Sequence, residues 1–194
     1  MDPYAVDPGL KFLLLAALLV GAILVFARVR FDYTRHRRLT RLTAIIQTTF
    51  FGLYALSSYV FLDSRVVSIT VSSPVFWIAA LLMTLGFLVV VLSMPFLGLR
   101  SFGRHVGSLH TTGPYHFTRN PQLVGGFLFV VGYALLWPSI LGFLWAALWL
   151  PIAHLMVRCE EAHLLDVFGK EYVAYCARTP RYLGLPRKWP RATR

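Results

Sequence analysis

Two polar stretches of the sequence hold the residue types that could carry out chemistry. The first, residues 107–126, contains the pair Asn120-Pro121. Asparagine is a preferred helix cap and proline a preferred first helical residue, so the pair predicts that a helix begins there. The free N–H groups at a helix start favour a negatively charged group, and Tyr115 and Arg119 lie close by as donors. The stretch therefore indicates either an anion-binding site or a plain interfacial loop that caps a helix.

The second polar stretch, residues 158–181, has the adjacent carboxylates Glu160 and Glu161 close behind an apolar segment. An ionisable group at the end of such a segment is costly unless it is paired, which makes it a candidate for function. Arg158 is the nearest basic partner in the sequence. The alternative interpretation is a surface helix whose charges meet only water.

Apolar and aromatic residues recur at spacings of three and four within the second stretch, and Gly169 interrupts them. This spacing predicts an amphipathic helix that lies against the membrane face or the first stretch, with a bend at the glycine. The residues of this stripe are Leu164, Leu165, Phe168, Tyr172 and Tyr175.

Other catalytic signatures do not occur in the sequence. The histidines lack the His-x-x-x-His spacing of zinc enzymes, and no phosphate loop or GxGxxG pattern is present. Cys159, beside the carboxylates, is a candidate nucleophile, although an inert small residue is the favoured interpretation. The sequence therefore predicts no metal site.

The elements that must position both stretches are apolar segments. Hydrophobic residues make up 57% and charged residues 14% of the 194 positions, which excludes a disordered chain and argues against a soluble nucleic-acid binder. A membrane-spanning helix needs about 20 mostly apolar residues. Five segments approach or reach that length: Leu10–Ala27, Leu42–Leu62, Val75–Leu99, Leu123–Trp137 and Ser139–Val157.

The predicted fold is all-α, a single membrane domain of about five transmembrane helices with a cytoplasmic amphipathic helix near its C-terminus. Residues 1–99 would supply three spans, and residues 100–194 a loop, a helical hairpin and a C-terminal segment. A re-entrant hairpin in place of the last two spans stays open. Because residues 1–10 carry no Lys or Arg and no small-residue cleavage site follows, the first segment is predicted to be a retained helix.

The basic residues are distributed unevenly along the chain. All but Lys11 and Arg65 of the 19 Lys and Arg residues lie in residues 28–41, residues 100–122 or the tail after Val157. Five spans put these three segments on one side of the membrane, and the positive-inside rule makes that side cytoplasmic. The N-terminus is then predicted to lie outside and the C-terminus in the cytoplasm.

Taken together and in this order, the two polar stretches resemble the isoprenylcysteine carboxyl methyltransferase and phospholipid methyltransferase superfamily. The resemblance covers residues 100–186 and rests on the combined pattern. In the first stretch the matching residues are Thr112-Gly113-Pro114-Tyr115, Arg119-Asn120-Pro121 and Gly125. In the second they are Glu160-Glu161, Leu164, Phe168-Gly169, Glu171-Tyr172, Tyr175 and Pro180.

The resemblance implies an integral membrane enzyme that uses S-adenosylmethionine in a cytoplasmic pocket. Glu160 would accept hydrogen bonds from polar groups of the cofactor, and Arg158 would be the catalytic residue, orienting the acceptor. The residues expected to bind the cofactor are Gly107, Ser108, Leu109, His110, Tyr115, Arg119, Asn120, Pro121, Gln122, Leu123, Glu160 and Glu161. The family often has tyrosine where Leu123 stands and histidine where Asn120 stands, and both departures concern the choice of acceptor.

The function expected from the resemblance is methyl transfer to a lipophilic or prenylated acceptor reached from the bilayer, as in isoprenylcysteine carboxyl methyltransferases. The alternatives are a phospholipid amine N-methyltransferase, a membrane reductase with a nicotinamide cofactor on a related scaffold, and a non-enzymatic membrane scaffold. The expected partners are a lipophilic small molecule and membrane lipids, and no nucleic acid. Carboxylate, amine and thiol acceptors all stay open, as does the oligomeric state.

Overall fold

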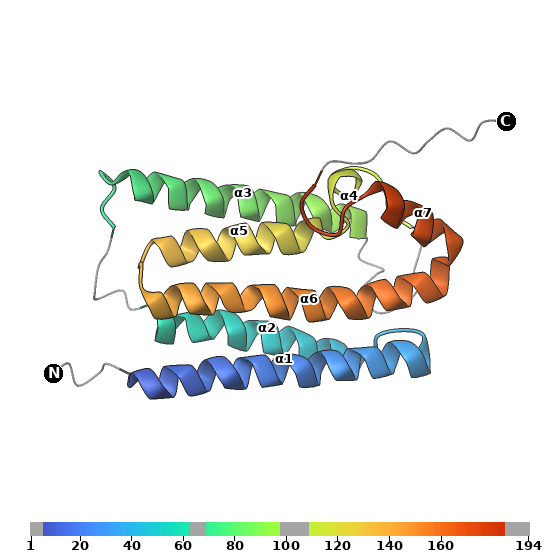
Figure 1. Ribbon diagram of the computed structural model, residues 1–194, viewed down its shortest axis with the longest axis horizontal. Coiled ribbons are helices and arrows are strands. Elements are labelled where there is room, and N and C mark those ends of the chain that lie inside the picture. Colours follow the sequence, from blue (N-terminus) through green and yellow to red (C-terminus); the bar gives the residue numbers. More distant parts are fainter. Residues whose placement is uncertain (1–5, 63–68, 98–108, 185–194) are drawn as a thin grey trace.

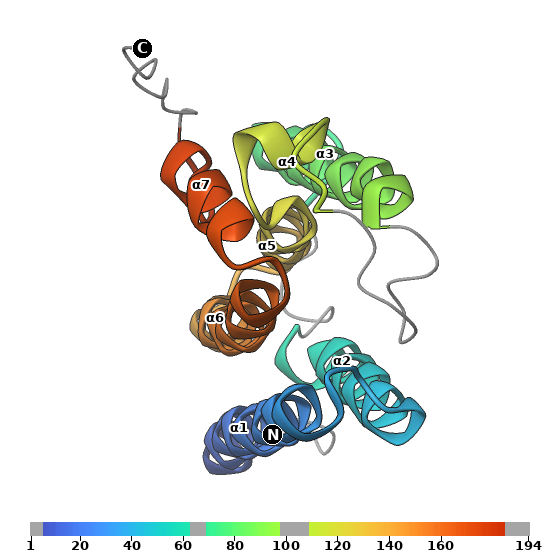
Figure 2. The same cartoon turned by 90° about the vertical axis from the view of Figure 1, so that its right-hand side faces the viewer.

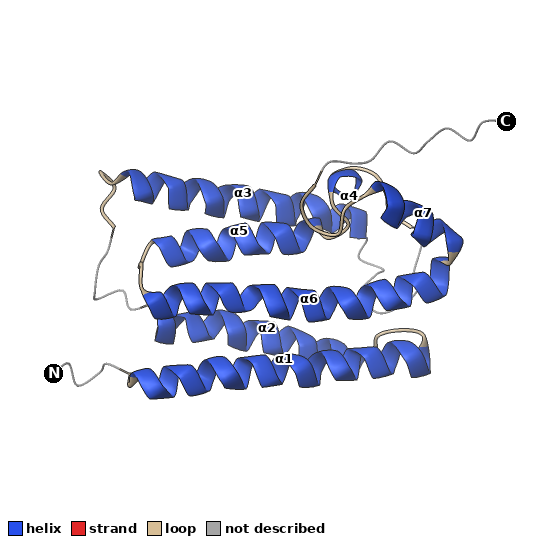
Figure 3. Cartoon of the chain, in the orientation of Figure 1, coloured by secondary structure: helices blue, strands red, loops and turns tan. Residues whose placement is uncertain are grey.

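A computed structural model describes residues 6–62, 69–97 and 109–184, and within these ranges every regular element is a helix (Figure 3). The prediction of an all-α fold is therefore confirmed. The helices are α1 (Pro8–His36), α2 (Arg41–Phe61), α3 (Pro74–Leu97), α4 (Pro114–Phe117), α5 (Pro121–Leu135), α6 (Ile140–Phe168) and α7 (Lys170–Arg178).

The long helices match the five apolar segments of the sequence. The helices α1, α2, α3 and α6 are long and apolar enough to cross a membrane. At 15 residues α5 is a shorter apolar helix, about 22 Å long against a hydrocarbon core of about 30 Å. The chain is therefore an integral membrane protein of about five spans. Both α1 and α6 also extend well past the predicted ends of their spans, at Ala27 and Val157.

The helix α6 connects the two halves of the bundle. It packs against α1 and α2 on one side and against α5 on the other, while α3 covers α5. Seen from the end, α6 lies between α1 and α5, with α3 outermost (Figure 2). The C-terminal part of α6, the short helices α4 and α7, and the α1–α2 connection all lie at the same end (Figure 1). The described parts of the three basic segments therefore share one end of the bundle, as the charge distribution predicts.

The packing of α3 against α5 depends on glycines that allow the two backbones to approach closely. A Cβ atom built on Gly125 would lie 2.7 Å from the carbonyl oxygen of Gly86, and one built on Gly86 would lie 2.5 Å from the carbonyl oxygen of Gly125. Small residues are the usual means of helix contact in membranes, where burying apolar surface provides little driving force. These contacts fix the start of α5, which carries part of the first polar stretch.

We expect the substitution Gly125→Val to destabilise the fold by roughly 2 kcal/mol, because the new side chain would be forced into the backbone of α3. Thermal unfolding of the purified protein in detergent measures the loss. Gly52→Val is the matched control, since a Cβ atom on Gly52 meets nothing within 4 Å. Equal melting temperatures for the two variants would contradict the assigned α3–α5 contact.

Candidate functional site

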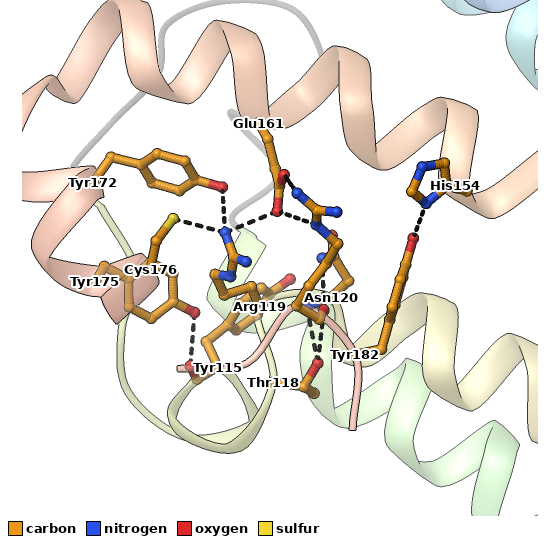
Figure 4. A network of polar contacts seen from close by, with 11 residues as sticks. Tyr115, Thr118, Arg119, Asn120, His154, Glu161, Tyr172, Tyr175, Cys176 and Tyr182 are labelled. Atoms are coloured by element: carbon orange, nitrogen blue, oxygen red, sulfur yellow. Dashed lines mark hydrogen bonds and ion pairs between the residues drawn. The ribbon is translucent and has the colours of Figure 1, made fainter. Parts of the chain in front are cut away.

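A cluster of polar side chains at this end of the bundle is centred on the carboxylate of Glu161, on α6 (Figure 4). Arg119 Nη1 lies 2.8 Å from Glu161 Oε1. Arg181 donates to the same carboxylate through two atoms, Nε to Oε1 at 3.0 Å and Nη2 to Oε2 at 2.6 Å. Such bidentate pairs are strong and fix geometry, and the hydrogen bond to Glu161 raises the pKa of Arg181. Glu161 therefore joins three segments far apart in the sequence.

Arg119 also connects the first polar stretch to α7. Its Nη1 atom donates to the Cys176 thiol at 2.7 Å and to the Tyr172 hydroxyl at 3.5 Å. Its side chain is only 12% exposed, and its buried Nε atom has no partner among the residues that the structure describes. Burial, and then the negative charge of Glu161, raise the pKa of Tyr172, which keeps its hydroxyl group protonated. The guanidinium group is thus held by acceptors on two helices.

The aromatic stripe predicted in the second stretch is divided between two helices. Gly169, with a φ angle of +50°, ends α6 and caps α7, so the predicted bend is confirmed. Tyr172 and Tyr175 on α7 are buried, whereas Leu165 on α6 is 47% exposed. The Tyr175 hydroxyl donates to the Tyr115 carbonyl oxygen at 2.7 Å. The tyrosines therefore dock α7 on the first stretch.

Residues 179–182, which we call the strap, lie along the first polar stretch. The carbonyl oxygen of Arg181 accepts hydrogen bonds from Asn120 Nδ2 at 2.9 Å and from Thr118 Oγ1 at 3.2 Å. The backbone N–H of Arg119 donates to the carbonyl oxygen of Pro180 at 2.9 Å. Tyr182 is the last residue of the strap and contacts α6, because its hydroxyl lies 3.1 Å from Nδ1 of His154 on that helix.

The start of α5 differs from the prediction in one respect. Pro121 is its first residue, as expected, and Asn120 occupies the cap position, but the Asn120 side chain makes no capping hydrogen bond. The prediction that this side chain caps the helix is therefore wrong. The strap offers the amide a competing acceptor, the Arg181 carbonyl oxygen. No hydrogen bond joins the backbone N–H of Gln122 to another residue that the structure describes.

Glu160 lies one turn beyond the apolar part of α6 and has different surroundings from Glu161. It makes no hydrogen bond or ion pair with any residue in the described part of the chain. Its charge lies close enough to Tyr115 to raise the pKa of that phenol, after burial as the larger cause. Burial, and then the charge of Glu161, raise the pKa of Glu160 to about 7. The two adjacent carboxylates thus differ sharply in their partners.

Arg158 is exposed and makes no ion pair with either glutamate within the described ranges. Although Arg158 is the nearest basic residue in the sequence, the partners of Glu161 come from the first stretch and the strap. Cys159 is buried, its thiol donates to the Phe26 carbonyl oxygen at 3.3 Å, and burial raises its pKa. These surroundings suit the inert residue that the sequence favours.

Among the remaining predicted site residues, Tyr115, Gln122 and Leu123 lie in or beside the cluster. The Tyr115 hydroxyl donates to Gln122 Oε1 at 3.1 Å, and Leu123 is buried against α6. Leu109 is half-buried and His110 exposed. Gly107 and Ser108 fall outside the described residues. The sequence analysis missed Thr118, Cys176, Arg181 and Tyr182. Cys176 lies one helical turn after Tyr172 on α7, a spacing that could have marked it, whereas the other three lie on irregular segments without a motif. No group of three or more potential metal ligands occurs among the described residues.

Comparison with known proteins adds a separate line of evidence. The sequence profile of the family described as phospholipid methyltransferase matches residues 74–171, from α3 to the start of α7. The nickel-cobalt-cadmium resistance protein NccN of Alcaligenes xylosoxydans xylosoxydans is 34% identical over 109 residues, which are 55% of this chain and 51% of that protein. The chain thus spans about half the length of this relative. No solved structure matches it significantly.

Proposed function

Because the chain belongs to the phospholipid methyltransferase family, we propose that it transfers a methyl group from S-adenosylmethionine to a lipophilic acceptor within the membrane. Membership of the family implies a membrane methyltransferase. The cofactor, the acceptor class and the site residues are our proposal. The observation that carries it is the pairing pattern of the two glutamates, since Glu161 is held by Arg119 and Arg181 while Glu160 has no described partner.

The residues around Glu160 fit a cofactor of this chemistry. A carboxylate accepts hydrogen bonds from ammonium and hydroxyl groups, and the uncapped start of α5 offers its N–H to a carboxylate. Tyr115 connects these two features, because its hydroxyl donates to Gln122 at the start of α5 and the charge of Glu160 acts on its phenol. Arg119, Asn120, Pro121 and Leu123 would form the wall of the pocket, and Glu161 would border it. S-adenosylmethionine supplies a methyl group already activated by its sulfonium centre.

The protein's own part in the reaction is therefore mainly alignment and proton handling. Holding the acceptor lone pair in line with the methyl group removes much of the entropic barrier. A carboxylate acceptor needs no base, whereas an amine or thiol must first lose a proton. Arg158 stays our proposed acceptor-orienting residue, and its exposure at the membrane end suits a ligand that arrives from the lipid.

Two acceptor classes agree with the family. A prenylated or otherwise lipophilic acceptor, as in isoprenylcysteine carboxyl methyltransferases, is our first choice, and a phospholipid amine is the alternative. Either acceptor is an amphiphile whose polar end lies at the depth of the helix ends. We further propose that the end carrying the site faces the cytoplasm and that the N-terminus lies outside, because the basic segments gather at the site end (Figure 1).

We expect the purified protein to bind S-adenosylmethionine and its demethylated product with a dissociation constant on the order of 1–100 µM, a range typical of enzyme substrates. Isothermal titration calorimetry in detergent measures it. A thermal-shift assay that compares NADPH with S-adenosylmethionine tests the reductase alternative, because a bound ligand raises the melting temperature of the protein. Binding of NADPH without S-adenosylmethionine would support the reductase, and binding of neither would contradict enzymatic use of these cofactors.

A further inference from the structure

The ion pair between Glu161 and Arg181 lies beside the proposed cofactor pocket but has no role in it so far. Arg181 belongs to the strap. Glu161 lies on α6 and Asn120 at the start of α5 (Figure 4). We propose that Arg181 and Glu161 are positioning residues, whose bidentate ion pair holds the strap against the start of α5 and so keeps the cofactor site open. This inference rests on the proposed function; it adds Arg181 to the site and gives Glu161, at the border of the pocket, a role that needs no contact with the cofactor.

Arg181 fixes the strap through both its side chain and its backbone. The guanidinium group of Arg181 is bound to Glu161 by two hydrogen bonds. The carbonyl oxygen of the same residue accepts from Asn120 Nδ2 and Thr118 Oγ1. Arg181 therefore links Glu161 on α6 to the start of α5 through the strap. Arg119 strengthens it, because its backbone donates to Pro180 while its side chain reaches Glu161.

The strap determines what the Asn120 side chain does. Asparagine is among the best helix caps, since its side-chain oxygen readily accepts from the first free N–H groups of a helix. Here the amide donates to Arg181 instead, and α5 begins without a side-chain cap. Without the strap, the Asn120 side chain would be free to turn onto the N–H of Gln122, which has no partner among the described residues, and occupy the place of a ligand carboxylate. A docked strap thus keeps the start of α5 available.

This arrangement makes strap docking and cofactor binding thermodynamically coupled. A docked strap raises the affinity for the cofactor, and by linkage a bound cofactor must stabilise the docked strap by the same factor. The coupling predicts effects in both directions, which a residue with a purely structural role would not produce together.

The direct test is the variant Arg181→Ala, with S-adenosylhomocysteine as the probe in calorimetry. We expect its dissociation constant to rise about tenfold or more, within the usual range of coupling between sites. In kinetic assays the KM for S-adenosylmethionine should rise while kcat at saturating cofactor stays within about twofold. Arg181→Lys, which keeps the charge but loses the planar fork, should recover part of the affinity.

Arg178→Ala is the matched control, because Arg178 is a nearby exposed arginine whose side chain contacts only the Ala174 carbonyl oxygen among the described residues. It should bind the probe as the unmodified protein does. Hydrogen exchange provides the reciprocal measurement: S-adenosylhomocysteine should slow exchange in residues 179–182 of the unmodified protein and have less effect in Arg181→Ala.

The outcomes separate this inference from the proposed function. If the unmodified protein binds the probe and Arg181→Ala binds it equally well, the positioning role is wrong and the proposed function survives. If Arg178→Ala and Arg181→Ala lose affinity alike, the loss reflects general charge and the inference is also wrong. If the unmodified protein binds neither S-adenosylmethionine nor S-adenosylhomocysteine, both proposals are wrong.

Discussion

Glu160→Gln is expected to weaken the binding of S-adenosylmethionine about 30-fold while leaving the fold intact. The substitution keeps the shape of the side chain and removes its negative charge. A hydrogen bond to a charged group contributes roughly 2 kcal/mol, which corresponds to this loss of affinity. Calorimetry measures the dissociation constant. Glu171→Gln, at an exposed carboxylate in the first turn of α7, is the control and should bind normally. An unchanged affinity in Glu160→Gln would show that Glu160 does not contact the cofactor.

The pKa of Glu160 gives the same variant two further signatures. Because this pKa is about 7, the unmodified protein should lose affinity for a cationic cofactor as the pH falls from about 8 to 6, and Glu160→Gln should not. The folded state also holds this proton more tightly than the unfolded chain does. The contribution of Glu160 to the free energy of unfolding therefore falls as the pH rises from 4.5 towards 7. At pH 8 the variant should melt above the unmodified protein, and it should lose that advantage at acid pH.

The neighbouring substitution, Glu161→Gln, should act first on stability. It removes the only carboxylate that Arg119 and Arg181 share among the described residues, and the Arg119 side chain is only 12% exposed. Breaking a buried ion pair by removing one partner typically costs about 3 kcal/mol or more, because the other charge stays buried. The melting temperature should fall by several degrees at pH 8, the opposite sign to that in Glu160→Gln.

Limited proteolysis and the melting temperature together distinguish Glu160→Gln from Glu161→Gln. Limited proteolysis should cut Glu161→Gln within or beside the strap at protease concentrations that leave Glu160→Gln intact, because only the first variant releases Arg181. The same exposed control, Glu171→Gln, should be cut no faster than the unmodified protein. If the two variants of the adjacent glutamates change stability in the same direction, the separate roles assigned to these residues are wrong.

The long helices could be predicted from the sequence because their signals are local. Runs of apolar residues gave α2 and α3 to within about two residues at each end, and the proline at position 121 marked the start of α5. The distribution of arginines also predicted correctly which segments share one end of the bundle (Figure 1). The ends of α1 and α6 were missed because both helices continue past the apolar segment as polar helices, and hydropathy carries no signal there.

The site could be predicted only in outline. The two polar stretches come together as expected, and Tyr115, Arg119 and Glu161 all lie in or beside one cluster. The predicted capping role of Asn120 was wrong, and the partners of Glu161 were not predicted, because the sequence points only to near neighbours such as Arg158. Their actual partner, Arg181, lies 20 residues from Glu161 and 61 from Asn120 on an irregular segment. Contacts of that range depend on the whole fold, and no local spacing encodes them.

The helix α6 runs without interruption from the lipid into the polar site, and this continuity sets a fixed depth for the chemistry. Glu160 follows Val157 by three residues, a rise of about 4.5 Å along a helix. Because the same helix carries both Val157 and Glu160, with no proline or glycine between them, the carboxylate keeps a fixed depth relative to the apolar part of α6. Under the proposed function, this depth would select among membrane acceptors. A molecule would be methylated when its reactive atom lies just above the acyl chains, whereas an equally reactive group on a longer headgroup would lie beyond reach.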